Sequence, residues 1–423
     1  MKQSTLPRVT VIGAGMILHD QILPSLYHLQ HQGRIGDIHI CGTRVSSIKA
    51  LLKSARFKKG FPGQSFTPYP DPSSYDASKS YPDLYKTVLQ EAPDQGFTII
   101  AVPDQLHYEM TLAALEFNQH ICVVKPLVLR YQEAETIARV AREKGLFVGV
   151  EYHKRFDHRA VMARKAYREG RLGDFRLAQA QMHEPWYYRD SNFQHWFTCE
   201  ETDMFTYVGC HYVDQVAFIT GLRPVAVSVY GIPDSFPNGN KGYLWTDARI
   251  LWENGACLNV VNAMGSPNAA AGANFQGLTM WGAGQDDGTM LVHSDQYRGM
   301  KHSYTTSAGG PGDTVYAEPN PDYMQLLELG GGRLTPVGYG YRSIEAIINA
   351  CIQVEKRGDI AARQAEIDLI DQEGIVATPK NSNYNELVIE AGRLSILAGG
   401  REVAIFYEPF PQVDFKTYKQ EMA

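Results

Sequence analysis

The stretch that decides the fold is RVTVIGAGMIL, residues 8–18. Its first five residues are rich in β-branched side chains, as in a buried strand, and apolar residues recur at helical spacing after the glycines. Strand, glycine turn and helix in this order suit a site where a dinucleotide pyrophosphate approaches backbone amides at a helix start. Leu18 stands where a third glycine is usual, so the fingerprint is incomplete. Taken alone, the pattern also fits a generic strand-to-helix turn.

Four further apolar runs continue this rhythm, each separated from the next by an amphipathic stretch, at 38–41, 97–102, 120–124 and 146–151. Strands joined by helices predict right-handed crossovers and a parallel sheet covered on both faces. We expect the Pro- and Ser-rich segment 61–82 to be an inserted surface loop. The pattern predicts an α/β Rossmann nucleotide-binding domain over residues 1–151, which favours the dinucleotide interpretation of the glycine turn.

The end of the second strand bears on the choice of cofactor. An NAD site commonly has an Asp or Glu there to hold the ribose hydroxyls, but this chain has Gly42, Thr43 and Arg44. A hydroxyl and a guanidinium could receive a 2′-phosphate, so this corner favours NADP over NAD. The alternative is that Arg44 is a solvated residue at a helix start, which leaves NAD open.

Three further motifs end the later strands: AVPD at 101–104 with His107, VKP at 124–126, and EYHKRF at 151–156. Together with the glycine turn they resemble the glucose-fructose oxidoreductase, inositol dehydrogenase and rhizopine-catabolism (Gfo/Idh/MocA) family, over most of residues 8–156. The resemblance implies an NAD(P)-dependent oxidoreductase whose cofactor is held by Gly13, Gly15, Met16, Ile17, Thr43, Arg44, Val102, Pro103, His107 and Lys125.

One departure from the family pattern is Val124, which replaces the usual Glu before Lys-Pro and leaves open how the cofactor is handled. Lys125 closes an apolar strand at the carboxyl edge of the predicted parallel sheet, where ligands bind in such folds. Partial burial there would suit its amine for proton exchange with a substrate hydroxyl. The alternative is a strand-end lysine in solvent.

The remaining residues, 152–423, lack this alternation. Beyond residue 224, short strands separated by Gly- or Asn-containing turns predict an α+β domain with an open, predominantly antiparallel sheet. The resemblance implies that this domain binds the substrate and forms a homodimer or homotetramer through its sheet. Two late helical stretches, 343–356 and 384–397, are candidates to pack back on the first domain.

Aromatic residues are concentrated over 183–212, where nine of thirty positions are Phe, Trp or Tyr although the whole chain has 11%. Such rings stack on the apolar faces of sugars. The alternative is that they pack between domains or in an oligomer interface.

A helix at the end of this stretch would place Tyr207, His211 and Asp214 on one face, at i, i+4 and i+7. The spacing resembles the family's second catalytic motif, in which a GxHxxD helix delivers a histidine to the nicotinamide. Tyr207 stands where sugar and inositol dehydrogenases often carry Asp, and a phenol is the weaker base, so the acid/base work falls on Lys125 and His211. The predicted catalytic residues are Lys125, His211 and Tyr207, and the predicted substrate contacts are His153, Lys154, Arg155, Glu184, Trp186 and Asp214.

The expected activity is hydride transfer between nicotinamide and a hydroxyl-bearing carbon of a sugar, polyol or cyclitol derivative. No metal is expected, because ammonium and imidazolium groups can stabilise an alkoxide. Two alternatives remain open. The first is an NAD-dependent glycosidase that uses transient C3 oxidation, elimination and rehydration, and the second is a noncatalytic dinucleotide sensor.

The composition of the chain bears on which classes of partner and which cellular compartment we expect. The chain has 423 residues, a formal net charge of −6 and no Lys/Arg run, so we expect no nucleic-acid partner. It has no apolar stretch long enough to span a membrane, and we expect no secretory leader, because the first residues run from a short polar lead into a strand pattern. Its six dispersed cysteines form no CxxC pair, which predicts reduced thiols in a cytoplasmic protein.

Overall fold

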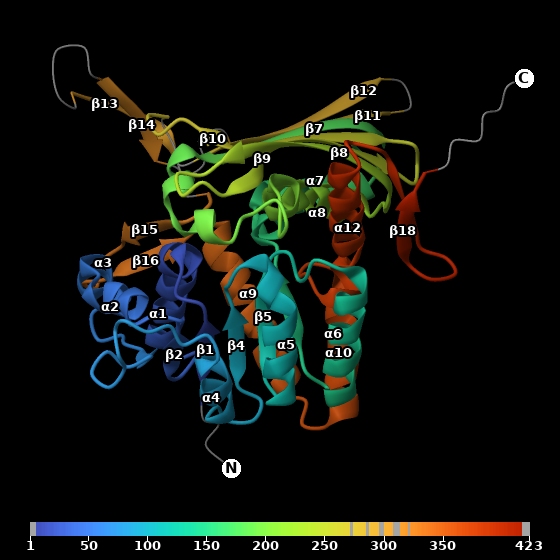
Figure 1. Ribbon diagram of the computed structural model, residues 1–423. Coiled ribbons are helices and arrows are strands. Elements are labelled where there is room, and N and C mark those ends of the chain that lie inside the picture. Colours follow the sequence, from blue (N-terminus) through green and yellow to red (C-terminus); the bar gives the residue numbers. More distant parts are fainter. Residues whose placement is uncertain are drawn as a thin grey trace, which may run out of the picture. The chain divides into compact units, whose positions relative to one another are not determined.

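The computed structural model describes residues 6–270, 274–284, 287–295, 300–307, 314–319 and 322–416. The chain forms two compact units (Figure 1). The first comprises Met1–Val128, Gln132–Phe156 and Pro321–Asn381, and the second comprises Leu129–Tyr131, Asp157–Asn320 and Ser382–Ala423. The division into domains at residue 151 stays a prediction, and the first unit also includes a late segment of the chain.

The first unit is built on six parallel strands in the order β3-β2-β1-β4-β5-β6. This is the doubly wound order, in which the strand sequence reverses beside β1 and leaves a crevice for ligands at the carboxyl edge. The predicted Rossmann fold is confirmed. The strands are β1 (Val9–Ile12), β2 (Ile38–Cys41), β3 (Thr67–Tyr69), β4 (Phe97–Ile100), β5 (His120–Val124) and β6 (Val148–Glu151).

The prediction of a plain loop over 61–82 is wrong at one place, because β3 lies within it and pairs with β2. Three residues are too few to show a periodic pattern, and Pro68 is tolerated because β3 is the edge of the sheet. The helices of this unit are α1 (Leu23–His31), α2 (Val45–Lys53), α3 (Ala55–Gly60), α4 (Leu84–Gln90), α5 (His107–Glu116), α6 (Tyr131–Lys144), α9 (Tyr339–Glu355) and α10 (Ile360–Glu373).

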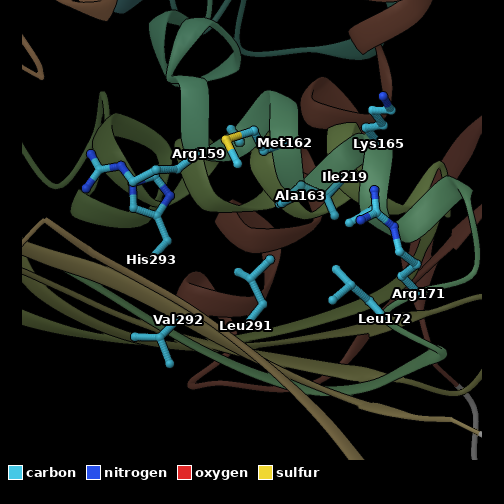
Figure 2. Close-up of a pocket in the computed structure, with 12 residues that line it drawn as sticks. Arg159, Met162, Ala163, Lys165, Arg171, Leu172, Ile219, Leu291, Val292 and His293 are labelled. Carbon is cyan, nitrogen blue, oxygen red and sulfur yellow. The ribbon is translucent and has the colours of Figure 1, made fainter.

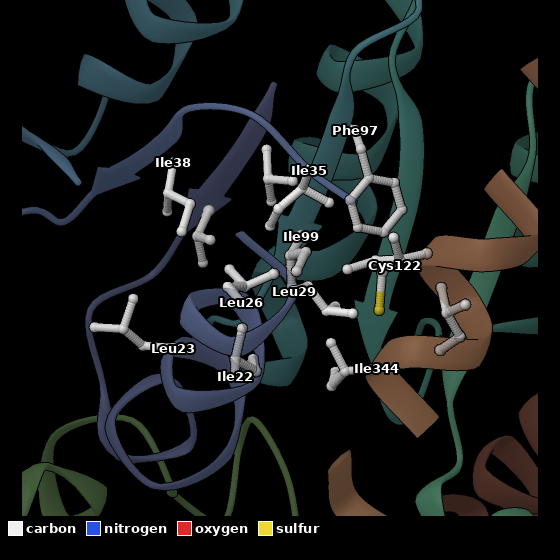
Figure 3. Close-up of a cluster of buried hydrophobic side chains, with 14 of the residues drawn as sticks. Ile22, Leu23, Leu26, Leu29, Ile35, Ile38, Phe97, Ile99, Cys122 and Ile344 are labelled. Atoms are coloured by element: carbon white, nitrogen blue, oxygen red, sulfur yellow. The ribbon is translucent and has the colours of Figure 1, made fainter. Parts of the chain in front are cut away.

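The core of the first unit joins α1, the sheet and α9 (Figure 3). Ile22, directly before α1, Leu26 of α1, Ile99 of β4, Cys122 of β5 and Ile344 of α9 are all almost fully buried in one cluster. Helix α9 therefore completes the first unit although it follows β6 by almost two hundred residues. A small hairpin, β15 (Gln325–Glu328) with β16 (Leu334–Val337), precedes it.

The second unit is built on an eight-stranded sheet in the order β12-β11-β7-β10-β9-β8-β17-β18. Only β7 and β10 are parallel, which confirms the predominantly antiparallel prediction. The strands are β7 (Asp174–Pro185), β8 (Pro224–Ser235), β9 (Lys241–Trp252), β10 (Cys257–Ser266), β11 (Phe275–Ala283), β12 (Gly288–Asp295), β17 (Val403–Phe406) and β18 (Gln412–Phe415). A separate hairpin pairs β13 (Met300–Ser307) with β14 (Thr314–Pro319).

Three helices cover one face of this sheet: α7 (His158–Arg168), α8 (Cys210–Thr220) and α12 (Tyr384–Leu397) (Figure 1). Of the two late helical stretches predicted from the sequence, the one at α12 belongs to this second unit. Its packing is close, since a Cβ on Gly231 of β8 would lie 2.8 Å from the Ile396 side chain.

The opposite face of the sheet is covered by no helix among the described residues (Figure 1). Apolar residues of this face are partly exposed. Leu177 is 40% exposed and Met290 is 62% exposed. Both belong to one cross-strand row of five apolar side chains, formed by Met290, Trp281, Leu177, Cys257 and Leu251.

Candidate active site

The two glycines of the turn after β1 have different surroundings. Gly13 has φ +116°, and a Cβ there would lie 2.0 Å from the carbonyl oxygen of Ala101, at the end of β4. A Cβ on Gly15 would meet no atom within 4 Å. Gly13 therefore permits the close approach of two strand ends, while Gly15 leaves open space beside the backbone.

The helix that follows starts at Met16 and contains a π-turn over Leu18–Ile22, in which the Leu23 amide donates to the Leu18 carbonyl. Pro24 has no amide to donate, which weakens the α-helical ladder at this place. Leu18, at the position of the missing third glycine, is fully buried. The amides of Gly15, Met16 and Ile17 come before the first full turn, where helical N–H groups have no intrahelical partner and attract anions.

The end of β2 lies directly beside this turn, because a Cβ on Gly42 would lie 2.9 Å from the Cβ of Ala14. Thr43 and Arg44 follow and are both exposed, with Arg44 as the N-cap residue of α2. The corner therefore presents a hydroxyl and a guanidinium next to the glycine turn. An exposed Arg44 at a helix start is also what the alternative describes, so its role toward a cofactor stays a prediction.

His107 ties together the ends of two neighbouring strands. Its ring is fully buried, with Nδ1 2.7 Å from the carbonyl oxygen of Pro126 and Nε2 3.0 Å from that of Val102. Lys125, which is half-buried, precedes Pro126 directly at the end of β5. The structure thus brings Gly13, Val102 and the Lys125 segment to one edge of the sheet, and it makes His107 a positioning residue for them.

The basic residues after β6 are buried within a short 3-10 turn, His153–Phe156. His153 Nδ1 lies 3.3 Å from a carboxylate oxygen of Glu151, Lys154 Nζ lies 5.9 Å from the ring centre of Tyr339, and Arg155 donates to the Asn381 amide oxygen at 3.2 Å. These contacts hold the turn inside the first unit. Their role toward substrate stays a prediction.

In the second unit, the prediction of one regular helix through Tyr207 is wrong. Phe205–Gly209 forms a π-turn, and α8 starts only at Cys210. The turn packs tightly onto β10, since a Cβ on Gly209 would lie 2.7 Å from the side-chain oxygen of Asn262 in β10. Because a π-turn holds more residues than an α-turn, the spacing of Tyr207 and His211 around the axis differs from that of an α-helix.

Tyr207 is half-buried among aromatic rings, with centroids 5.2 Å from Phe193 and 5.8 Å from Phe197. His211 is almost fully buried. Asp214 Oδ1 accepts hydrogen bonds from the Tyr384 hydroxyl at 2.9 Å and from the Asn385 amide at 3.2 Å. Asp214 thereby fastens α8 to α12.

The other two predicted substrate contacts differ in exposure. Glu184 is buried and accepts a hydrogen bond from the Asn274 amide at 2.9 Å. Trp186 is 43% exposed, and one face of its ring is covered by the Arg189 guanidinium 3.8 Å away. The aromatic excess therefore serves two purposes: Phe193 and its neighbours form part of the core, while the Trp186 ring stays accessible.

A cavity of about 500 Å³ lies elsewhere in the second unit, between α7, α8 and β12 (Figure 2). Met162 and Ala163 of α7 and Leu291 of β12 form its apolar walls, and Arg159 and His293 lie together at one end. None of the predicted site residues lines it.

Several residues of the site were not predicted from the sequence. Gln21 and Glu151 are buried and hydrogen-bonded to each other within the first unit, and Arg189 supports Trp186. One signal was available: Gln21 lies on the face of its helix that carries the buried Leu18 and Ile22, and a polar residue on such a face needs a buried partner.

Among the described residues, no group of three or more His, Cys, Asp or Glu side chains could hold a metal ion. Within the same residues, no helix is long and apolar enough to cross a bilayer. The six cysteines are all free thiols, four of them buried.

Two family models match the chain: an oxidoreductase family with an NAD-binding Rossmann fold over residues 7–152, and the GFO/IDH/MocA C-terminal domain over residues 160–276. Among curated proteins, the chain is 32% identical over 138 residues to scyllo-inositol 2-dehydrogenase (NADP(+)) IolW of Bacillus subtilis, which covers 32% of this chain and 37% of that protein. It is 25% identical over 174 residues to D-glucoside 3-dehydrogenase of Escherichia coli, covering 41% of this chain and 42% of that protein. The chain thus matches less than half the length of these relatives.

Solved structures resemble the whole fold. GenD2 from gentamicin A biosynthesis, in complex with NAD, has a TM-score of 0.64 at 16% identity and covers 96% of this chain and 98% of its own. Scyllo-inositol dehydrogenase from Lactobacillus casei, with NAD(H) and scyllo-inositol, has a TM-score of 0.59 at 14% identity and covers 95% of this chain and 99% of its own. The two family models together span more than half of the sequence, and the chain belongs to the Gfo/Idh/MocA oxidoreductase family.

Proposed function

We propose that the chain is an NAD(P)-dependent dehydrogenase that moves a hydride between nicotinamide and a hydroxyl-bearing carbon of a sugar, polyol or cyclitol derivative. The observation that carries this proposal is the edge of the first sheet, where Gly13, Gly15 and the Lys125 segment lie at the ends of β1 and β5. The names of the relatives, an inositol dehydrogenase and a glucoside dehydrogenase, support the same substrate class.

The glycine turn fits a dinucleotide, because Gly15 leaves space where a Cβ would point and the helix start presents amides to an anion. Gly13, Gly15, Met16 and Ile17 would hold the pyrophosphate, Thr43 and Arg44 the adenosine ribose, and the segment from Val102 to His107, with Lys125, the nicotinamide half. When bound, the nicotinamide accepts or supplies the hydride.

Lys125 and His211 are the proposed proton-transfer groups. In the oxidative direction, Lys125 Nζ takes the proton of the substrate hydroxyl as the carbon loses its hydride, and it returns the proton in reduction. An ammonium or imidazolium also stabilises negative charge that develops on the substrate oxygen. Tyr207 offers a phenol hydroxyl for hydrogen bonding in a largely aromatic environment.

The corner after β2 supports a preference for NADP, since Arg44 is exposed and can pair with a 2′-phosphate. IolW is an NADP-dependent enzyme by its name, whereas GenD2 was solved with NAD. Comparing KM for the two cofactors in wild type and Arg44→Ala decides between them: loss of an NADP preference in the variant supports the proposal.

The activity is tested with purified protein, a panel of inositols, free sugars and glucosides, and both oxidised cofactors. We expect reduced cofactor to accumulate with at least one compound, and Lys125→Met to lower kcat/KM by about 10²- to 10⁴-fold. Glycoside cleavage without net reduced cofactor, with exchange of the C2 hydrogen for solvent deuterium, would assign the NAD-dependent glycosidase reaction instead. If the protein binds a dinucleotide but turns over none of the compounds, the noncatalytic dinucleotide sensor becomes the favoured function.

Assembly through the second sheet is part of the proposal. The outer row from Met290 to Leu251 is apolar and partly exposed, and contiguous apolar patches of this kind commonly mark protein interfaces. A second copy of the chain, seated against this row, would bury it in a homodimer or homotetramer.

A further inference from the structure

A buried polar network lies behind the start of the first helix. Gln21, in the π-turn, is fully buried, and its Nε2 donates to Glu151 Oε1 at 2.7 Å and to the Gly340 carbonyl at 3.0 Å. Its Oε1 accepts from the Tyr323 hydroxyl at 2.8 Å. The hydrogen-bond partners of the Gln21 side chain therefore come from β6, from α9 and from Tyr323.

Glu151 is the centre of the network. Its carboxylate is 3% exposed, and burial of a charge is costly unless hydrogen bonds compensate it. Besides Gln21, Ser343 donates to Oε1 at 2.5 Å, and His153 Nδ1 lies 3.3 Å from Oε2. Glu151 is the last residue of β6 and pairs with Val124 of β5 in the sheet register. Lys125 is the residue that follows Val124.

The remaining partners in the network come from the late segment that contains Tyr323 and α9, and they pack closely around Gln21. A Cβ on Gly340 would lie 3.1 Å from the Tyr323 ring and 3.3 Å from Gln21 Cδ. Gly340 and Ser343 both belong to α9, so α9 and β6 together fix the position of Gln21.

The π-turn connects the position of Gln21 to ligand binding. A π-turn is rare and is maintained by tertiary contacts, because each of its hydrogen bonds spans one residue more than in an α-helix. Without the anchor at Gln21, the helix can relax toward regular α geometry, which rotates the residues before the turn. Those residues are Gly15, Met16 and Ile17, which lie at the start of the helix, where the pyrophosphate is proposed to bind.

We propose that Glu151 and Gln21 form a positioning pair that holds the π-turn in the one geometry that aims the helix-start amides at the dinucleotide pyrophosphate. Neither side chain touches the cofactor. The proposal rests on the proposed function, since it presupposes that a dinucleotide binds at the glycine turn.

The test compares cofactor affinity with stability in three variants: Glu151→Ala, Gln21→Met, which keeps the side-chain volume, and Ser343→Ala, which removes a single donor. The Kd for NADH and NADPH is measured by fluorescence titration, well below the Tm of each variant. We expect Glu151→Ala and Gln21→Met to raise the Kd about tenfold, because each removes the hydrogen bond between Gln21 and Glu151 that anchors the π-turn. Ser343→Ala leaves that bond in place and should raise the Kd less. At saturating cofactor, kcat should stay within about threefold.

His120→Gln is the matched control. His120 is fully buried in the same unit, accepts a hydrogen bond from the Phe147 amide at 2.9 Å and lies 3.1 Å from Glu355, but it is at the opposite, amino end of β5. It should lower the Tm and leave the Kd unchanged. If folded Gln21→Met binds as wild type does, or if the control weakens binding as much for the same loss of Tm, the positioning role is wrong. If wild type binds neither dinucleotide, the proposed function fails as well.

Discussion

Gly13 and Gly15 are two residues apart and should respond differently to the same added methyl group. Gly13→Ala places a Cβ on the Ala101 carbonyl at a φ of +116°, so it should lower the free energy of unfolding by about 3 kcal/mol or more. Gly15→Ala meets no atom and should keep stability within about 1 kcal/mol. It should still weaken dinucleotide binding about tenfold, because the methyl group occupies the approach of the pyrophosphate. Urea denaturation measures the change in stability, and cofactor titration measures the change in affinity. If Gly15→Ala binds the dinucleotide as tightly as wild type does, the pyrophosphate does not bind at this turn.

A second residue with a predictable effect is His107. His107→Ala removes two contacts to carbonyl oxygens in a fully buried position, so we expect a loss of about 2–4 kcal/mol in unfolding free energy. It should also lower kcat, since the Lys125 segment loses its connection to β4. The measurement is chemical denaturation together with steady-state kinetics, and a partial recovery of kcat in His107→Gln would support positioning. A stable His107→Ala variant with full kcat would contradict it.

At the level of residues, the sequence predicted the positions that follow from parallel-sheet geometry. Lys125, Val102 and Thr43 each follow the end of a strand by one or two residues, and the carboxyl ends of parallel strands meet at one edge. It did not predict Gln21 or Ser343, because their importance depends on a contact made across more than three hundred residues.

At the level of elements, Asp157 and His293 join the start of α7 to the edge strand β12. His293 Nε2 lies 3.0 Å from Asp157 Oδ2, and Gln215 lies 2.8 Å from His293 Nδ1. Burial acts to raise the pKa of Asp157, but hydrogen bonds from His293 and Arg159 outweigh it and hold the pKa well below its usual range.

This pair should make stability depend on pH. Since the folded pKa of Asp157 is depressed, its contribution is present above the unfolded value of about 3.9 and is lost as the pH falls toward the folded pKa. Asp157→Asn should therefore destabilise the protein by about 3 kcal/mol at pH 7, and its difference from wild type should shrink below about pH 4. Thermal unfolding of both proteins between pH 3 and 7 measures this, and a difference that stays constant over that range would refute it.

Most elements were predicted from hydrophobic periodicity, but the two π-turns and β3 were not. Apolar spacing near 3.6 residues does not reveal a single π-turn, because the one extra residue shifts the pattern only once within a short helix. Both π-turns, Leu18–Ile22 and Phe205–Gly209, fall in the helices that carry the predicted motifs. Such turns are frequent at functional sites, in agreement with that placement.

At the scale of the whole molecule, the outer face of the second sheet predicts an assembly. Leu177→Asp places a charge in the apolar row and should shift the protein to a smaller species in size-exclusion chromatography with light scattering. Met162→Asp is the control, since Met162 is 70% exposed but belongs to α7, on the other face. An unchanged mass in Leu177→Asp, or a monomeric wild type, would exclude this interface.

The architecture of both units followed from the sequence, because βαβ alternation and short strands with turns each predict one class of sheet. The inclusion of residues 321–381 in the first unit could not be derived from pattern alone. The sequence of α9 predicts an amphipathic helix, but it does not predict which of the two sheets buries Ile344 and Ile347.

The central claim is direct hydride transfer, and it is tested most directly with an alcohol substrate that carries deuterium on its reacting carbon. We predict that deuterium appears at C4 of the reduced nicotinamide, detected by mass spectrometry and NMR, and that Lys125→Met lowers the rate of this transfer. Deuterium found in water instead of the cofactor, or no label in the nicotinamide while the substrate is consumed, would contradict the account.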